Sequence, residues 1–265
     1  MSNSDLWIRD IITTYGLSLV IFILIAVVIS RKWSYLQNRI YKAYLTGFEL
    51  ECAKVMAPYK RHLFQSLEHI VSNDNVLRSM GSIRLLEIGV KMGENIQFYP
   101  DYTHLIGVDR NLKLADYLIK GNRSCQFSHV IIERLIIGDG SSLKEIPTGY
   151  VDVVVTTRSL CSVTSLKSTL QEIHRVLTPG GQYLFVEHIA ENEGTFVRWL
   201  QGMLSRTKIW PSLFGGCHLN VNPIVDIKNA GFNHVVWDTF TVESYASRSF
   251  HWILSKQHVL GVAVR

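Results

Sequence analysis

Residues 85–95 constrain the fold of this chain more than any other segment, and they read LLEIGVKMGEN. An apolar run enters a turn that contains Gly89 and Gly93, and a second apolar run ends at Asp109, twenty residues after Gly89. Glycine lets backbone N–H groups approach a ligand closely, and a carboxylate about 20 residues further on can accept hydrogen bonds from two ribose hydroxyls. The pattern predicts an open α/β sheet with a nucleotide-type site at the ends of its first two strands.

Apolar and β-branched runs predict seven strands. They cover residues 83–88, 104–109, 130–137, 151–157, 182–188, 233–240 and 257–264. We expect helices between the first five strands, because such alternation favours a mostly parallel sheet with helices on both faces. Residues 241–256 have no long helical pattern, so the last two strands are expected to form an antiparallel hairpin at the edge.

Two segments fix the register of this pattern. Residues 151–155 read VDVVV, as expected of a central strand that is buried on both faces. Leu170, Ile173 and Leu177 recur at helical spacing, and the TPGG sequence of residues 178–181 is expected to stop that helix and turn the chain into the next strand.

The N-terminal segment is apolar over a long stretch, since residues 11–29 contain no charged side chain. A helix of roughly 20 such residues spans a bilayer core. A cleaved signal peptide is the alternative. Asp5 and Asp10 precede the stretch, no small-x-small cleavage site follows it, and Arg31 and Lys32 end it. We therefore expect an uncleaved membrane anchor over residues 1–32.

Basic residues gather next to this anchor. Residues 31–61 contain seven Lys or Arg side chains against Glu49 and Glu51, in a chain whose formal net charge is +5. The positive-inside rule then places the following domain on the cytosolic face, and the same charges attract anionic lipid. No basic stripe interleaved with aromatic residues is present elsewhere, so a nucleic-acid partner is not expected.

The anchor is followed by residues 33–80, which are mostly helical in pattern, with Pro58 expected to break the run. Apolar residues recur at helical spacing from Leu63 to Ile70, which predicts an amphipathic helix that packs on the domain or on the membrane. The expected organisation is thus an anchor (1–32), a helical juxtamembrane segment (33–80) and a sheet domain (81–265).

The chain has four cysteines, which are widely spaced and form no C-x-x-C pair. They are Cys52, Cys125, Cys161 and Cys217. This pattern is typical of reduced thiols in a cytosolic domain rather than of a disulfide or zinc framework, so no metal site is expected.

Several segments resemble class I S-adenosylmethionine-dependent methyltransferases. They are LLEIG at 85–89, VD at 108–109, VDVVV at 151–155 and LTPGG at 177–181. Four further segments resemble, within that class, the membrane-anchored thiol methyltransferases of the methyltransferase-like seven family. They are NIQFYP at 95–100, LCSV at 160–163, VEH at 186–188 and GCHL at 216–219. The resemblance implies a Rossmann-like seven-stranded sheet, S-adenosylmethionine as cofactor, and a small-molecule acceptor, most simply a lipophilic thiol.

The resemblance also implies roles for single residues. Glu87, Gly89 and Gly93 would lie beside the methionine part of the cofactor, and Asp109 would accept hydrogen bonds from both ribose hydroxyls. An acidic Glu87 suits a cationic sulfonium, which has no pyrophosphate to repel it. Asp139 occupies the place where such enzymes contact adenine; alternatively, its carboxylate caps a helix that starts at Ser141.

The end of the fourth strand carries two further candidates, Thr156 and Thr157, whose hydroxyls can contact cofactor or substrate at the sheet edge where open α/β folds bind ligands. Threonine is also a routine strand-end residue, and this second reading stays open.

Lys91 departs from the family pattern Glu-x-Gly-x-Gly-x-Gly, in which glycine is usual at this position. If the position needs a positive φ, lysine costs on the order of 1 kcal/mol or more. Either the ammonium pairs with the cofactor carboxylate, or the site has decayed and the fold survives as a membrane-bound scaffold.

His188, at the end of the fifth strand, is the candidate to accept a proton from the acceptor. The alternatives are a histidine that only bonds neighbouring loops, and a thiol acceptor that needs no base because its pKa is near 8.5. Cys217 and His218 are expected to line or close the acceptor pocket.

The sequence therefore predicts a membrane-anchored, cytosol-facing methyltransferase at the endoplasmic reticulum or a lipid droplet. An O- or N-methyltransferase of a small molecule is the enzymatic alternative, and a non-catalytic scaffold is the other.

Overall fold

The computed structural model describes residues 3–111, 127–242 and 250–265. Its centre is a seven-stranded sheet. The strands are β1 (Arg84–Ile88), β2 (Thr103–Asp109), β3 (Val130–Ile137), β4 (Val151–Thr157), β5 (Leu177–His188), β6 (His234–Thr241) and β7 (Gln257–Val264). Their order is β3-β2-β1-β4-β5-β7-β6, with β1 to β5 parallel and β7 antiparallel to both β5 and β6. The predicted α/β sheet and its edge hairpin are confirmed.

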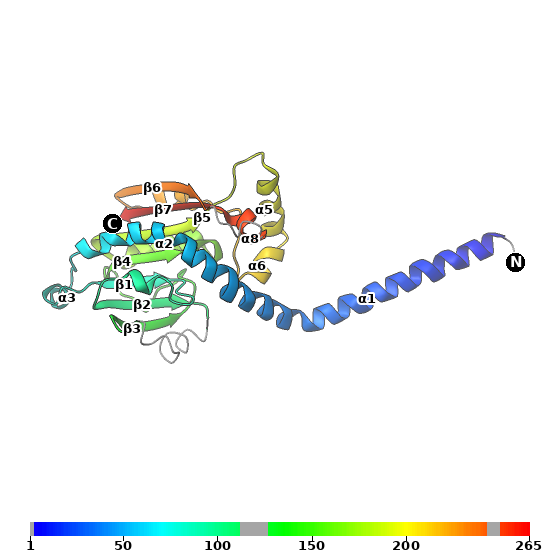
Figure 1. Cartoon of the computed structure of the whole chain (residues 1–265), viewed down its shortest axis with the longest axis horizontal. Helices are drawn as coiled ribbons and strands as arrows, with labels where there is room; N and C mark the ends of the chain where they lie inside the picture. The colour runs from blue at the N-terminus through cyan, green and yellow to red at the C-terminus, as the bar shows by residue number, and fades with distance from the viewer. Residues whose placement is uncertain (1–2, 112–126, 243–249) are drawn as a thin grey trace.

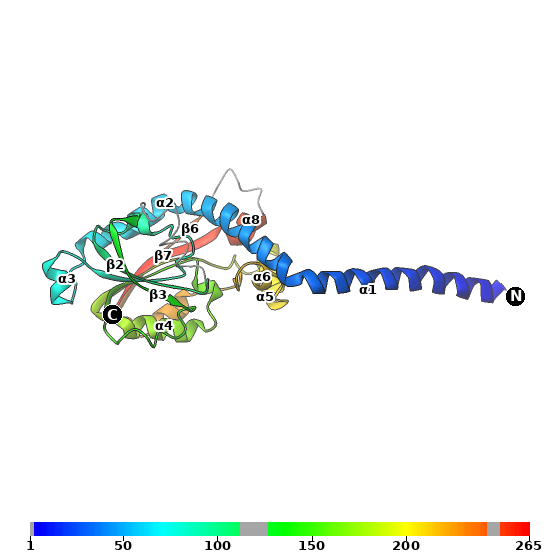
Figure 2. The same ribbon diagram turned by 90° about the horizontal axis from the view of Figure 1, so that it is seen from below.

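The sheet separates two hydrophobic cores because β4 is buried along its whole length and alternate side chains point to opposite faces. On one face Val153 and Val155 pack with Met56 and Phe64 of α2 (Leu50–Phe64). On the other face, side chains of α4 (Leu166–Val176) and α7 (Ile224–Lys228) cover the sheet. Figure 2 shows α2 and α4 on opposite sides, so the helices cover both faces as expected.

The connections after β1 and β3 differ from the prediction. Only a short 3₁₀ turn, η3 (Ile96–Phe98), follows β1, and no helix joins β3 to β4, so both predicted helices are wrong. Left-handed residues interrupt each connection: Lys91 and Gly93 have φ of 53° and 76°, and Gly140 has φ of 81°. An α-helix cannot continue through such residues. The predicted helix between β2 and β3 falls largely on residues 112–126, outside the described residues.

Helix α4 lies between β4 and β5 as predicted. The Ser165 side chain caps it by accepting a hydrogen bond from the backbone N–H of Ser168 (3.2 Å), and Leu177 is already extended. Strand β5 starts at that leucine, so the TPGG segment lies within the strand rather than in a loop. A side chain at Gly181 would lie 2.9 Å from the Asp152 carbonyl oxygen, which explains the glycine.

The N-terminal segment is one long helical path. Helix α1 (Asn3–Tyr44) continues through a π-helical turn, η1 (Leu45–Glu49), into α2. Pro58 lies inside α2, so the predicted break there is wrong. Proline removes one backbone hydrogen bond. The buried side chains of Met56 and Leu63 hold α2 on the sheet across that position. A 3₁₀ turn, η2 (Gln65–His69), and α3 (Asn75–Ser79) complete this segment.

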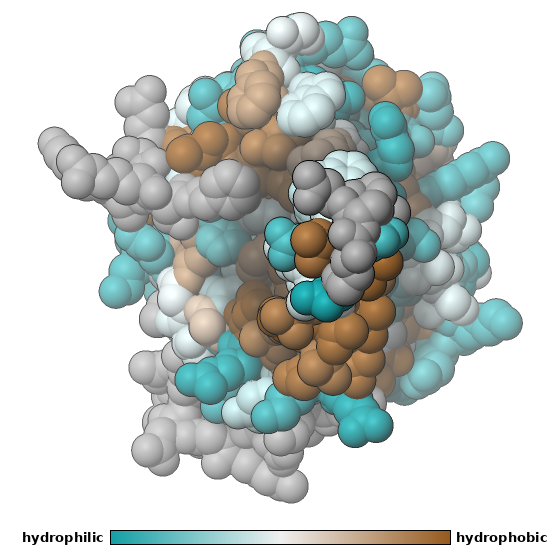
Figure 3. Space-filling view, turned by 90° about the vertical axis from the view of Figure 1, so that its right-hand side faces the viewer, coloured by the Kyte–Doolittle hydropathy of each residue, from teal (hydrophilic) through white to brown (hydrophobic). Residues whose placement is uncertain are grey.

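Helix α1 projects away from the sheet domain (Figure 1), and its apolar stretch is exposed: Phe22 is 69% and Leu24 59% exposed. Seen from the N-terminal side, apolar side chains gather around this helix (Figure 3). It is long and apolar enough to cross a membrane.

The last turns of α1 dock on the domain. Gln37 donates a hydrogen bond to the Ser212 carbonyl oxygen (3.0 Å), and the rings of Tyr44 and Phe214 lie 5.2 Å apart. Three helices make up this part of the domain: α5 (Phe196–Arg206), α6 (Ile209–Leu213) and α8 (Phe250–Ser255).

Candidate active site

The turn after β1 and the end of β2 are joined as the sequence predicts. Gly89 has φ of 81°, and a Cβ there would lie 2.5 Å from the Cβ of Ser159, so only glycine fits between the turns that follow β1 and β4. The backbone N–H of Lys91 donates to Asp109 Oδ2 (2.8 Å). This contact holds the Asp109 carboxylate beside the glycine turn.

Among the described residues, Asp109 has two backbone donors, which leaves it further acceptor capacity. Its Oδ1 accepts from the backbone N–H of Asn111 (2.8 Å), and the side chain is only partly buried. Because an ionised carboxylate has about four lone-pair sites, it can still accept hydrogen bonds from two hydroxyls. Asp109 therefore stands at the sheet edge in a state suited to a ribose.

Lys91 has the left-handed backbone that the glycine pattern implied, with φ of 53°. Its ammonium pairs with Glu49 of η1, with Nζ and Oε2 2.8 Å apart. Glu49 also contacts Arg158 (3.4 Å) and accepts a hydrogen bond from the Tyr44 hydroxyl. Burial alone would raise the pKa of Glu49, but the charges of Lys91 and Arg158 outweigh it and hold that pKa well below its ordinary value.

A narrow cavity lies beneath α2 beside this pair. Basic Lys60, Lys91 and Arg158 line it together with acidic Glu49 and Glu94. The centre of a water molecule can occupy a volume of about 10 Å³ in this cavity. That is room for roughly one water molecule. A ligand larger than water needs more room than the lining side chains leave in this conformation.

Glu87 lies beneath the same turn but is already occupied by protein donors. Its carboxylate accepts from Asn95 Nδ2 (2.6 Å) and from the Tyr99 hydroxyl (2.8 Å). Burial raises the pKa of Glu87 to about 7, against the effect of these two hydrogen bonds. Glu87 therefore anchors the loop after β1. Gly93, with φ of 76°, allows that loop to turn.

The two threonines of β4 point to opposite faces. Thr157 lines the cavity and accepts a hydrogen bond from Asn95 Nδ2 (3.0 Å). Thr156 is fully buried on the α4 side, where its hydroxyl lies 2.9 Å from the Tyr183 hydroxyl. Only Thr157 is placed to meet a ligand at the glycine turn.

Asp139 is bonded to its own loop and to the loops after β2 and β4. Its carboxylate accepts from the backbone N–H groups of Ser141 (3.0 Å) and Thr164 (2.7 Å), and it pairs with Arg110 (2.9 Å). No helix begins at Ser141, so the expected helix cap is wrong, and the carboxylate caps a turn instead.

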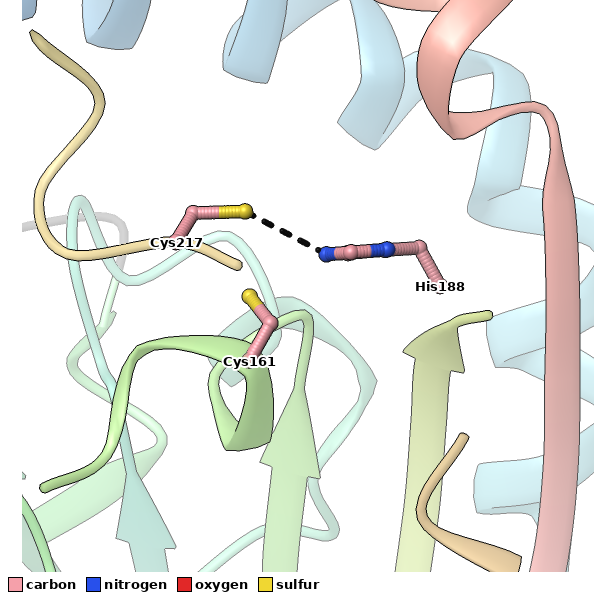
Figure 4. Close-up of side chains that lie close together, drawn as sticks. All are labelled: Cys161, His188 and Cys217. Carbon is pink, nitrogen blue, oxygen red and sulfur yellow. Dashed lines mark hydrogen bonds between the residues drawn. The ribbon is translucent and has the colours of Figure 1, made fainter. Parts of the chain in front are cut away.

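His188 ends β5 and is 1% exposed. Its Nε2 lies 3.3 Å from Cys217 Sγ, with Cys161 beside both (Figure 4). His218, the neighbour of Cys217 in sequence, is not part of this group. The side chain of Glu187 accepts backbone hydrogen bonds from Ser159 (3.0 Å) and Leu160 (3.2 Å) instead of supporting His188.

Comparison with known proteins identifies the chain. A family model described as a methyltransferase domain matches residues 86–185. The thiol S-methyltransferase TMT1A of Homo sapiens is 31% identical over 236 residues, which cover 88% of this chain and 89% of that protein. The thiol S-methyltransferase TMT1B of Rattus norvegicus is 34% identical over 80% of each chain. The chain belongs to this methyltransferase family. It is an S-adenosylmethionine-dependent methyltransferase, which confirms the resemblance seen in the sequence.

Solved structures support the fold of this methyltransferase. An S-adenosylmethionine-dependent methyltransferase from Methanosarcina mazei has a TM-score of 0.51 at 16% identity and covers 69% of this chain and 92% of its own. A phosphoethanolamine N-methyltransferase of Haemonchus contortus, solved with S-adenosylhomocysteine, has a TM-score of 0.51 at 15% identity. The match covers 69% of this chain and 49% of that chain. At this identity the likeness concerns the fold alone.

The residues of this methyltransferase fit S-adenosylmethionine in chemical type. Asp109 offers acceptors for a ribose, and the cavity beside Gly89 combines cations and carboxylates, which complement the two charges of an amino-acid group. In the described conformation Lys91 and Glu49, which both line the cavity, pair with each other.

Sequence reasoning missed Glu49 and His258 and did not select Arg158 as a site residue. Arg158 is 6% exposed, has φ of 49°, and donates to His258 Nε2 (2.8 Å). Glu49 and His258 lie 109 and 100 residues from Arg158 in sequence, and no motif connects them. Only the packing of η1 and β7 around the end of β4 brings them together.

Proposed function

We propose that this methyltransferase is membrane-anchored and transfers a methyl group to a small lipophilic thiol. The observation that carries the proposal is the similarity to relatives named thiol S-methyltransferases over four fifths or more of the chain. Helix α1, long and apolar enough to cross a membrane, supports the anchor over residues 1–32.

The chain's own residues have limited chemistry to perform in this reaction. S-adenosylmethionine supplies the methyl group on a positively charged sulfur. Gly89, Asp109 and Thr157 would hold the cofactor at the carboxyl ends of β1, β2 and β4. Lys91 and Glu49 must separate to admit the methionine part of the cofactor, and their charges are then free to meet its carboxylate and ammonium groups.

We propose that no dedicated base is needed. The Nε2 of His188 faces a cysteine sulfur rather than the cavity, and a thiol already has an appreciable thiolate fraction near neutral pH. Proximity and alignment of the acceptor sulfur with the methyl group would then supply most of the rate.

The acceptor class is tested with the full chain in detergent and isotopically labelled S-adenosylmethionine. A panel of thiols, phenols and amines of matched size is offered. We expect label in the thiol products. Labelled phenol or amine without labelled thiol would overturn the proposed acceptor.

We propose that the sheet domain faces the cytosol at the endoplasmic reticulum or a lipid droplet. This orientation is proposed because basic residues follow the apolar stretch. Protease added to sealed microsomes should then digest the domain. Full protection would place it in the lumen.

A further inference from the structure

Three metal-binding side chains meet at the carboxyl ends of β4 and β5. They are Cys161, His188 and Cys217, and their Sγ and nitrogen atoms all lie within 4.8 Å of one another. Figure 4 shows the two sulfur atoms and the imidazole directed toward a common centre. All three residues are buried, with 6% exposure at most.

Three separate segments of the fold hold these side chains in place. Cys161 lies on the 3₁₀ turn η6 (Leu160–Ser162). The Glu187 carboxylate fixes this turn by accepting a hydrogen bond from its backbone. His188 is fixed at the end of β5 by pairing with β7. Cys217 is brought close because the backbone N–H of the following residue donates to the Cys161 carbonyl oxygen (2.9 Å). The donor atoms therefore converge without help from a bound group.

The spacing of the donors suits a tetrahedral zinc ion. Zinc lies about 2.3 Å from sulfur and about 2.0 Å from nitrogen, so sulfur and nitrogen ligands of one ion stand roughly 3.5 Å apart. The observed distance between Cys217 Sγ and His188 Nε2 is 3.3 Å. Small rotations of the cysteine side chains suffice to complete the geometry.

His188 is otherwise poorly explained. Among the described residues its Nδ1 is buried without a hydrogen-bond partner, and the contact that positions the ring is the 3.3 Å approach of Nε2 to Cys217 Sγ. The surroundings are apolar, with Trp210, Leu219 and Leu254 packed around the two cysteines. A metal bond at Nε2 would fix the ring in this dry environment, and Nδ1 would carry the imidazole proton.

We propose that Cys161, His188 and Cys217 bind one zinc-type divalent ion. Two thiolates and one imidazole are a ligand set that zinc accepts, and three protein ligands leave a fourth position for water or another soft ligand. The ion would tie η6, the end of β5 and the loop at residues 216–219 together. The spacing of the cysteines in the sequence did not predict this site, because its ligands are far apart in sequence and only the fold brings them together. The inference requires neither the proposed acceptor nor bound cofactor.

The test uses the full chain in detergent, kept under a phosphine reductant and stripped of metal with a chelator. Co²⁺ is titrated as a spectroscopic probe of zinc sites. We expect saturation at one Co²⁺ per chain, with a thiolate-to-cobalt charge-transfer band that Zn²⁺ abolishes by displacement. A wild-type protein without this band overturns the inference.

Two variants and a matched control locate the site. Cys161→Ser and Cys217→Ser should each weaken Co²⁺ binding at least tenfold and reduce the band. Cys52→Ser should change neither, because Cys52 is equally buried but lies on α2, where its sulfur contacts that of Met56. Retention of the band in both cluster variants, or its loss in the control, contradicts the assignment.

Failure of this inference can be told apart from failure of the proposed function. Methyl transfer to thiols by protein that shows no cobalt band would leave the acceptor class standing and remove the metal site. A cobalt band in protein that methylates only phenols or amines would do the reverse.

Discussion

At the scale of single residues, two energies oppose each other at Lys91. The left-handed backbone, with φ of 53°, costs a residue with a Cβ roughly 1–2 kcal/mol. Breaking a buried ion pair by removing one partner costs about 3–5 kcal/mol. Lys91 is 18% exposed and Glu49 7% exposed, so the pair is only weakly screened. The ion pair outweighs the strain.

We therefore expect Lys91→Gly to lower the free energy of unfolding by about 1–4 kcal/mol, as the difference between these two contributions. Urea denaturation followed by tryptophan fluorescence measures it. Adding Glu49→Gln to this variant should restore part of the loss, because the buried carboxylate that has lost the charge of Lys91 is then replaced by a neutral amide. A single variant more stable than the wild type would mean that backbone strain dominates.

Glu87 should make stability depend on pH in the cofactor-free protein. Its pKa is raised from 4.5 to about 7 by burial, so the folded state holds a proton that the unfolded state releases. This contribution, roughly 3 kcal/mol, is fully present below pH 4.5 and lost as the pH rises to about 7.

The comparison is wild type against Glu87→Gln, by denaturation at pH 5 and pH 8. We expect the variant to gain stability relative to the wild type at pH 8. An equal difference at both pH values would show that Glu87 is ionised throughout.

The sequence identified the residues of the glycine turn but not all of their partners. Gly89 and Asp109 lie together because strand ends and turn conformations are local consequences of sequence. The pairing of Lys91 with Glu49 depends on a helix that crosses the sheet, and periodicity carries no information about such a contact.

At the scale of elements, Asp152 joins the segment before α3 to β1, the first strand of the sheet. Its carboxylate accepts from the Ser72 hydroxyl (2.7 Å) and from the backbone N–H groups of Asn73 (2.9 Å) and Arg84 (2.8 Å), and it is 3% exposed. One side chain of β4 thus fixes both the chain before α3 and the start of β1.

Asp152→Asn should lower the free energy of unfolding by about 2 kcal/mol or more, because an amide nitrogen would face buried donors. Thermal melting and urea denaturation measure it. Asp238→Asn on the exposed edge strand β6 is the matched control and should change stability by less than about 0.5 kcal/mol. Equal changes in stability for the two variants would show that Asp152 does not fix the chain before α3 and the start of β1.

The strands were more predictable than the connections. Runs such as residues 151–157 leave few alternatives to a buried strand, and the structure has that strand at the same residues. The connections after β1 and β3 are controlled by single left-handed residues and by carboxylates such as Asp139, whose effect depends on groups from other loops. The alternation expected of an α/β sheet therefore misassigned them as helices.

At the scale of the whole molecule, the apolar N-terminal helix and the sheet domain share one continuous helical path. The path leaves the apolar stretch of α1, docks on α6 through Gln37, and supplies Phe48 and Glu49 to the domain. The domain's stability should therefore depend on where the chain is cut.

Deletion of residues 1–32 should abolish co-sedimentation with lipid vesicles and change the free energy of unfolding by less than about 0.5 kcal/mol. Deletion of residues 1–49 should in addition destabilise the domain by several kcal/mol, since Lys91 and Arg158 then remain buried without Glu49. Equal stability of the two truncated proteins would show that η1 contributes nothing to the fold.

The ion pair between Glu49 and Lys91 has a consequence for how such chains diverge. The two positions lie 42 residues apart, Glu49 in the helical path before the sheet and Lys91 in the turn after β1. A chain with glycine at the position of Lys91 has less positive charge to compensate a buried acid at the position of Glu49. We therefore expect the two positions to covary among descendants of a common ancestor, with acid and lysine gained or lost together. An acid retained opposite glycine in most lineages would contradict this expectation.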